Sequence, residues 1–280
     1  MATKNILKIM LMMITIFTIA GSAVYAAEIP VSDQDQLITS SDWTEISNLQ
    51  DEMKKEEPNV TIDYDKALKV YVDCNLIKLQ TADTKKLTSA LESANYVWVI
   101  PFKMEKTYGM FTVAKGLPLS EEAKSVLTKA EQEEVKNHAG KWMITETAEH
   151  TVEPYYDILL EKREALSDCT RVVLVGSQPG MRQPVALGMD DETARIWISL
   201  GYQYPVMEKI PETQNVESGV YSFDSVAEIS DTYIEDSEVS TGAGVQSRSS
   251  MKYVAGIGII VIGSILILSV LKKKKLEDYE

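Results

Sequence analysis

The sequence predicts an α+β fold with antiparallel hairpins or a meander and about three packed helices, followed by an acidic stalk and one transmembrane helix. Two observations predict the folded part. Short segments alternate apolar with polar residues or run continuously apolar, as strands do, and longer segments repeat apolar residues on one helical face. These segments are interspersed over residues 59–206, a stretch long enough to bury a hydrophobic core. A third observation, an uncharged run near the C-terminus, predicts the membrane span.

Several segments of the expected domain have the pattern of strands. Residues 68–72 alternate, which is the period of a half-buried strand with Lys69 on its exposed side. Residues 96–102 are continuously apolar, and residues 108–115 follow them as a hairpin partner. The other predicted strands cover residues 142–145, 171–175, 184–188 and 194–200, the last three as a meander.

Three helices are expected between these strands. Asp83 caps the first, Ser120 caps the second, which runs to about Asn137, and Pro154 starts the third. The second helix is expected to turn one apolar face toward the core, consisting of Ala123, Val126, Leu127 and Ala130.

The segment ahead of the predicted domain, residues 27–58, is polar and contains one further candidate helix over residues 42–55. Asp42 is its expected cap. Apolar residues recur at spacings of three, three and four on one face of this helix; they are Trp43, Ile46, Leu49 and Met53. We therefore expect the helix to pack on the domain.

The N-terminus has the three parts of a signal peptide, assigned to residues 1–26. Lysines make its start positive, residues 9–20 are apolar and uncharged, and small residues lead up to Ala26. As a helix the apolar run spans about 18 Å, less than a hydrocarbon core of about 30 Å. Cleavage between Ala26 and Ala27 is therefore predicted, rather than an uncleaved anchor.

Residues 253–271 form an uncharged stretch, rich in Ile, Val and Leu, that is long enough to cross a bilayer. Four lysines follow at once and match the cytoplasmic side under the positive-inside rule; they are Lys272, Lys273, Lys274 and Lys275. The predicted topology in the cell membrane is single-pass type I, with the domain outside and residues 272–280 as a cytoplasmic tail. A tail this short cannot fold, so another subunit would have to carry any signal.

The chain is acidic, with a formal net charge of −14. Such a charge repels phosphate backbones, which excludes nucleic-acid binding through a basic surface as a leading hypothesis. Residues 207–252 are rich in Glu, Asp, Ser, Thr and Gly and keep neither a helical nor a strand period. We expect them to form a flexible acidic stalk between the domain and the membrane. The alternative is that residues 220–223 and 226–233 form short ordered pieces within it.

Cys74 and Cys169 both fall in the predicted exported domain, each beside a predicted strand. In an oxidising compartment such a pair is expected to form a disulfide, worth roughly 4 to 5 kcal/mol in the chain-entropy estimate. The alternative is two buried free thiols. A catalytic thiol is disfavoured because the chain places neither His138 nor His150 near a cysteine.

A short loop follows the predicted strand of residues 171–175, where a phosphate or nucleophile loop would lie; its residues are Ser177, Gln178, Pro179 and Gly180. It lacks both the G-x-S-x-G pattern and the Walker lysine. Pro179 and Gly180 suit the central positions of a type II turn. A hairpin turn is therefore expected, with a functional loop on the rim of the domain as the alternative.

No metal or cofactor site is predicted. The two cysteines and two histidines are not closely paired along the chain, as zinc ligands usually are. The acidic clusters lack the spacing of an EF-hand, so solvated turns and a repelling stalk are favoured.

These observations predict a membrane-anchored module at the cell surface that is not an enzyme. It is expected to bind or sense an extracellular ligand or protein, and to assemble with other membrane-protein subunits. Its topology, its short tail and the absence of catalytic motifs motivate this hypothesis. The alternative is a membrane-tethered envelope hydrolase with a carboxylate site, although abundant acidic residues single out no catalytic pair.

Overall fold

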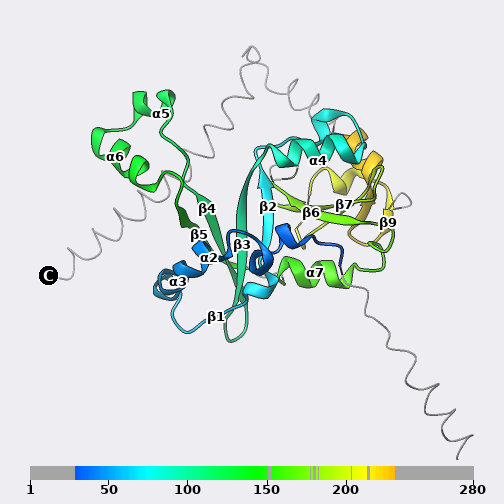
Figure 1. Ribbon diagram of the computed structural model, residues 1–280. Coiled ribbons are helices and arrows are strands. Elements are labelled where there is room, and N and C mark those ends of the chain that lie inside the picture. The colour runs from blue at the N-terminus through cyan, green and yellow to red at the C-terminus, as the bar shows by residue number, and fades with distance from the viewer. Residues whose placement is uncertain are drawn as a thin grey trace, which may run out of the picture.

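The computed structural model describes residues 29–150, 153–176, 178, 181, 183–202, 204–212 and 215–230. In this part of the chain, ten strands form one mostly antiparallel sheet flanked by a few helices, so the predicted α+β class is confirmed (Figure 1). The strands are β1 (Thr61–Ile62), β2 (Leu68–Val72), β3 (Asn95–Lys103), β4 (Tyr108–Lys115), β5 (Trp142–His150), β6 (Arg171–Val175), β7 (Val185–Met189), β8 (Ala194–Ile198), β9 (Asn215–Glu217) and β10 (Val220–Ser222).

The helices are short. They are α2 (Trp43–Ile46), α3 (Gln50–Glu56), α4 (Thr84–Glu92), α5 (Glu121–Val126), α6 (Lys129–His138) and α7 (Tyr155–Glu161), and residues 223–230 are also helical. In Figure 1, α5 and α6 stand away from the sheet, and the others pack on it. Single 3-10 turns join several elements, namely η1 (Asp33–Asp35), η2 (Leu37–Thr39), η3 (Ser47–Leu49), η4 (Tyr64–Lys66), η5 (Ile77–Leu79) and η6 (Met207–Lys209).

The sheet consists of two meanders on either side of the central strand β2. Its order is β5-β4-β3-β2-β6-β7-β8-β10-β9, with β1 paired to β3. The described pairs are antiparallel except β2 with β6, which run parallel. The predicted hairpin and the predicted meander are thus confirmed. The fifth strand is longer than expected, because β5 pairs with β4 as far as His150.

The two faces of the sheet hold separate parts of the core. Val70 of β2 pairs with Leu174 of β6, and both belong to one hydrophobic cluster. The next pair, Tyr71 with Val175, belongs to another. Because successive side chains point to opposite faces, these clusters lie on opposite sides of the sheet.

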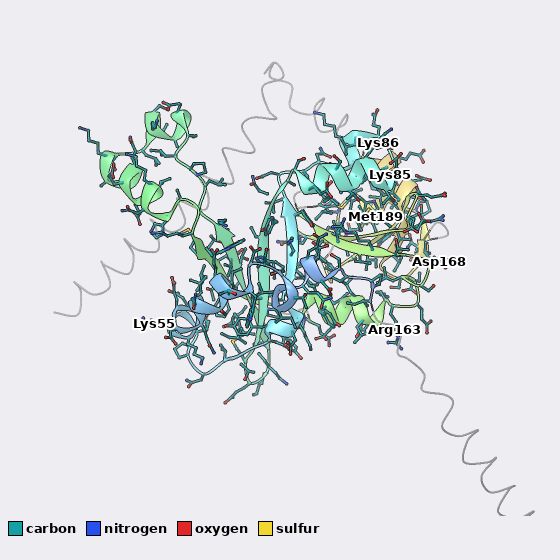
Figure 2. The ribbon with its side chains drawn as sticks, in the orientation of Figure 1. Lys55, Lys85, Lys86, Arg163, Asp168 and Met189 are labelled. Carbon is teal, nitrogen blue, oxygen red and sulfur yellow. The ribbon has the colours of Figure 1, made fainter. Side chains whose placement is uncertain are left out.

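Helices α4 and α7 cover these two faces. Leu87 of α4 belongs to the cluster that contains Tyr71, whereas Leu159 of α7 belongs to the cluster that contains Val70. Figure 2 shows the same arrangement, with Lys85 and Lys86 on α4 and Arg163 after α7 at opposite sides of the sheet.

The prediction that β2 is a half-exposed strand is wrong. Tyr71 is only 6% exposed, and the Lys69 side chain is only 11% exposed. The reason is position: β2 lies in the middle of the sheet, where both faces are covered. A central strand can therefore bury polar side chains that the alternating pattern assigns to solvent.

The N-terminal segment packs on the sheet, as expected for its helical part. Residues 29–36 lie beside β2 and β6, where Val31 bridges to Val172 and Gln36 to Leu68, and residues 37–56 lie against β3 and β4.

The expected helix over residues 42–55 is broken into α2, η3 and α3, and its Ile46 and Met53 are fully buried against β3 and β4. Asp42 is not a side-chain cap. Its Oδ2 instead accepts hydrogen bonds from the Tyr96 hydroxyl and the Trp98 indole N–H, at 2.9 Å and 3.0 Å.

The expected single helix from Ser120 to Asn137 is divided in two. Ser120 caps α5, but the chain is extended at Leu127, and Thr128 then caps α6 in a reciprocal capping box with Glu131. A second cap forces a new start, so the apolar residues no longer share one face.

The folded domain extends beyond the expected boundary at residue 206. β10 pairs with β8, and Phe223 and Val226 on the following helix are 4% and 0% exposed. Residues 207–230 were expected to begin the stalk, but isolated apolar residues in this acidic segment complete the sheet and its core. The remainder of the predicted stalk, residues 231–252, lies outside the described residues.

Candidate functional site

Polar side chains gather at Asp35, which is only 2% exposed. Its Oδ1 accepts a hydrogen bond of 2.7 Å from the Tyr71 hydroxyl. Its Oδ2 accepts hydrogen bonds of 2.6 Å from the Ser32 hydroxyl and 3.1 Å from the Arg171 guanidinium. The Lys69 ammonium lies 3.8 Å from Oδ1. We call Asp35, Lys69, Tyr71 and Arg171 the Asp35 cluster.

Aromatic rings surround the lysine of the Asp35 cluster. The Lys69 Nζ lies 4.5 Å from the ring centre of Tyr96, 5.3 Å from that of Trp98 and 5.8 Å from that of Tyr71. Burial lowers the pKa of Lys69 from its usual range, while the nearby Asp35 and Asp42 oppose this change. Burial, followed by the hydrogen bond to Asp35, raises the pKa of Tyr71 well above its usual range.

The Asp35 cluster fits a structural clamp better than a reacting centre. Both oxygens of Asp35 are already occupied by donors from the protein, which leaves the carboxylate poorly placed to act on a substrate. Its partners come from β2 and β6, whereas Asp35 itself comes from η1. The cluster therefore fastens the N-terminal segment to the centre of the sheet.

A cavity of about 250 Å³ lies between the loop after η5 and the last described helix. Its lining residues are Ile77, Gln80, Thr81, Ala82, Phe223, Asp224, Ala227 and Glu228. Phe223 also stacks on Trp197, with ring centres 5.7 Å apart. The lining thus mixes apolar residues with polar ones, among them the carboxylates of Asp224 and Glu228.

The predicted rim loop is described only at Gln178; Ser177, Pro179 and Gly180 lie outside the described residues. Gln178 is only 3% exposed. Its Oε1 accepts a hydrogen bond from the Leu76 N–H, and its Nε2 donates to the carbonyls of Cys74 and Gly176. Gln178 therefore holds the β6–β7 connection to the loop after β2.

The structure does not contain the predicted disulfide, since Cys74 and Cys169 are both free thiols. Cys74 packs against the cluster beneath α4, and Cys169 belongs to the cluster beneath α7. The two thiols thus lie on opposite faces of the sheet, where no bridge can form without moving the backbone. Burial raises the pKa of each thiol to about 11.

The most exposed element of the domain is the insertion between β4 and β5, residues 116–141, which we call the arm. Figure 1 shows its two helices standing away from the sheet. None of its described side chains is buried, and Leu117 and Val126 are 48% and 66% exposed. The prediction that Ala123, Val126, Leu127 and Ala130 face the core is therefore wrong.

The base of the arm is held by backbone hydrogen bonds. The Gly116 N–H donates to Lys141 at 2.9 Å, and the Gly140 N–H donates back to Gly116 at 2.7 Å. Gly140 has a φ of +74°, a conformation that favours glycine. The arm is thus fixed at its base while its helices contribute nothing to the core.

Several predicted features lie outside the described residues. They are the cleavage site at Ala26 and Ala27, the span of residues 253–271, and the lysines from Lys272 to Lys275. Among the residues that are described, no helix is long and apolar enough to cross a membrane. Within the same residues, no three His, Cys, Asp or Glu side chains converge as metal ligands would.

Sequence reasoning missed the Asp35 cluster and the free arm. One signal for a polar cluster was available in β2, where the charged Lys69 and the aromatic Tyr71 lie on the same side of the strand. Asp35 itself carries no such signal, because it lies in a polar segment among other acids.

Comparison with known proteins adds no relative: no protein-family model, curated protein or solved structure matches this chain.

Proposed function

We propose that this chain is a single-pass type I membrane protein whose extracytoplasmic domain binds a protein or another ligand at the cell surface. The signal peptide and the span expected from the sequence support the anchoring. The arm supports the binding, since it is an insertion with two helices that buries none of its described side chains in the core.

The arm costs free energy to fold, and its own side-chain contacts do not offset that cost. Folding orders its 26 residues at the cost of conformational entropy, yet the arm buries none of its described side chains in return. Exposed apolar residues such as Leu117 and Val126 are what a partner would cover. The capping box and the fixed base keep the arm in shape, which lowers the ordering cost when a partner binds.

The alternative of a membrane-tethered hydrolase lacks a specific observation in its favour. Asp35 is the buried carboxylate of the described residues, and its oxygens already accept hydrogen bonds from Ser32, Tyr71 and Arg171. We therefore keep binding as the proposed function.

Photo-crosslinking of the full-length protein in living cells tests this proposal. A photoreactive residue placed at Val126, at the exposed end of α5, should give discrete adducts of higher mass. The same residue placed at Lys85, exposed on α4, is the matched control and should not give them. Equal labelling at both positions, or none at Val126, would count against a binding role for the arm.

A protease added outside intact cells tests the anchoring separately. It should remove the domain and spare a tag at the C-terminus. If that tag were digested, the type I topology would be wrong.

A further inference from the structure

β5 forms one edge of the sheet. It is the terminal strand of the order, runs for nine residues and pairs with β4 on one side. Among the described residues, no strand pairs with its other side. The opposite edge of the sheet is formed by β9, which has only three residues. β5 is thus the long free edge, and such an edge is a template for another strand.

Part of β5 is regular enough to receive a strand. The pairing with β4 shifts between Thr112 and Val113, where Thr145 is passed over. Beyond this bulge, the pairs run without interruption from Glu146 opposite Thr112 to His150 opposite Tyr108. A bulge discourages pairing only locally. The five residues from Glu146 to His150 are therefore the available stretch.

Two common protections of an edge, proline and lysine, are absent from this stretch, and it keeps two acidic side chains. β5 contains no proline and no lysine, the residues that most often block edges. Its charged side chains include Glu146 and Glu149, and both are exposed. Neither forms an ion pair with a described side chain.

The two glutamates project from opposite faces of the strand. Glu146 is opposite Thr112, and Glu149 is opposite Gly109. Because positions three apart in a strand point to opposite faces, an incoming strand meets a carboxylate on each side. Beside Glu149, the space over Gly109 is filled by the ring of Phe102, the residue that pairs with Gly109 in β3.

Charge decides the kind of partner. Opposite charges on neighbouring strands stabilise pairing and like charges oppose it. A second copy of this chain would bring another acidic edge and another net charge of −14. An extended segment with lysine or arginine three residues apart would instead place a cation beside each glutamate.

The base of the arm lies at one end of this edge. The arm leaves the sheet directly after Lys115 and returns directly before Trp142, the first residue of β5. Its exposed Leu117 lies at that base.

We infer that β5 is a strand-addition site for an extended basic segment of a partner protein. Backbone hydrogen bonds to the free edge would supply affinity, and Glu146 and Glu149 would supply selectivity. This inference rests on the proposed binding function and names the chemistry of the partner.

Hydrogen exchange on the full-length protein in lipid nanodiscs tests the inference. The probe is a ten-residue peptide of threonine and valine with lysines three residues apart. The amides from Glu146 to His150 that face outward should exchange at least tenfold more slowly when the peptide is present. No added protection in β5 would overturn the inference.

Two controls separate strand addition from attraction between charges. A peptide of the same charge with two central prolines cannot extend a sheet and should give no protection. The variant E146K/E149K should lose the protection, whereas D51K/E52K, with the same charge change on exposed positions of α3, should keep it. Equal protection by the proline peptide, or equal loss in both variants, would show charge attraction alone and reject the site.

The outcome is distinguishable from failure of the proposed function. If Val126 gives adducts in cells while β5 gains no protection, the binding function stands and this site is wrong. If the size of the protein in nanodiscs doubles while β5 becomes protected without peptide, a second copy occupies the edge and the basic partner is rejected.

Discussion

Asp35 and Arg171 lie 136 residues apart in the chain, yet the guanidinium donates a hydrogen bond of 3.1 Å to the carboxylate. The contact joins η1 in the N-terminal segment to the first residue of β6. Tyr71 in the central strand donates to the same carboxylate. One buried anion therefore ties together the N-terminal segment, the centre of the sheet and the second meander.

Removing this anion should unfold the domain more easily. The variant D35A leaves Arg171 and Lys69 buried without their counter-charge, which typically costs about 3–5 kcal/mol. The free energy of unfolding, measured in denaturant, should fall by about that amount. D33A, an exposed neighbour in the same turn, should change it by less than about 0.5 kcal/mol. Equal effects of the two variants would refute the clamp.

Gln178 should matter for stability, and no reactivity is expected of it. The variant Q178A leaves the Leu76 N–H and the Cys74 carbonyl without a partner inside the protein. We expect a loss of about 2–3 kcal/mol, since each buried unsatisfied group costs about 1–3 kcal/mol. The loss is measured by thermal unfolding of Q178A, with Q34A, a variant of an exposed glutamine, as the control. An unchanged midpoint for Q178A would contradict the role.

Both cysteines should be found as thiols. Without reductant, the folded protein should react slowly with a thiol reagent, and the denatured protein should react at two sites. Complete protection of the denatured protein until a reductant is added would show a disulfide and contradict the structure.

The two thiols should also make stability depend on pH. Their folded pKa values are raised to about 11 by burial, from ordinary values of 9.0. Their contribution is therefore complete below about pH 9 and is lost as the pH rises through about 11. The variant C74A/C169A should lose stability less steeply over this range than the unaltered protein. If the free energy of unfolding fell equally with pH in the variant and the unaltered protein, the two thiols would not be the origin of the pH dependence.

The strands were predictable because the local pattern decides them. Residues 96–115 and 171–200 have the local pattern of a hairpin and a meander, and β3, β4, β6, β7 and β8 lie where periodicity places them. The burial of Lys69 was not predictable in the same way. It depends on β2 becoming the central strand, and sequence period alone does not give strand order.

For the arm, the sequence pattern predicted buried side chains and the structure shows exposed ones, the reverse of Lys69. The spacing of Ala123, Val126 and Leu127 is that of a core-facing helix, yet Val126 is 66% exposed. Apolar spacing reports that a helix has an apolar face, and it does not say whether the protein's own core or a partner covers that face.

The arm should be dispensable for folding. Lys115 and Trp142 are directly opposite in the pairing of β4 with β5, so an Asn-Gly turn can replace residues 116–141. Because no buried side chain is removed, the unfolding midpoint of this variant should stay within a few degrees of the unaltered protein. Loss of cooperative unfolding would assign the arm to the core after all.

The size of the native assembly tests the central claim most directly. The full-length protein and the variant with the Asn-Gly turn are extracted from cells in mild detergent, and their masses are compared. If the arm binds a partner, the unaltered protein migrates with additional mass and the variant migrates as the bare chain. If both carry the same additional mass, a partner binds elsewhere on the domain and the arm is not the binding element. If neither carries any additional mass, the proposed binding function is contradicted.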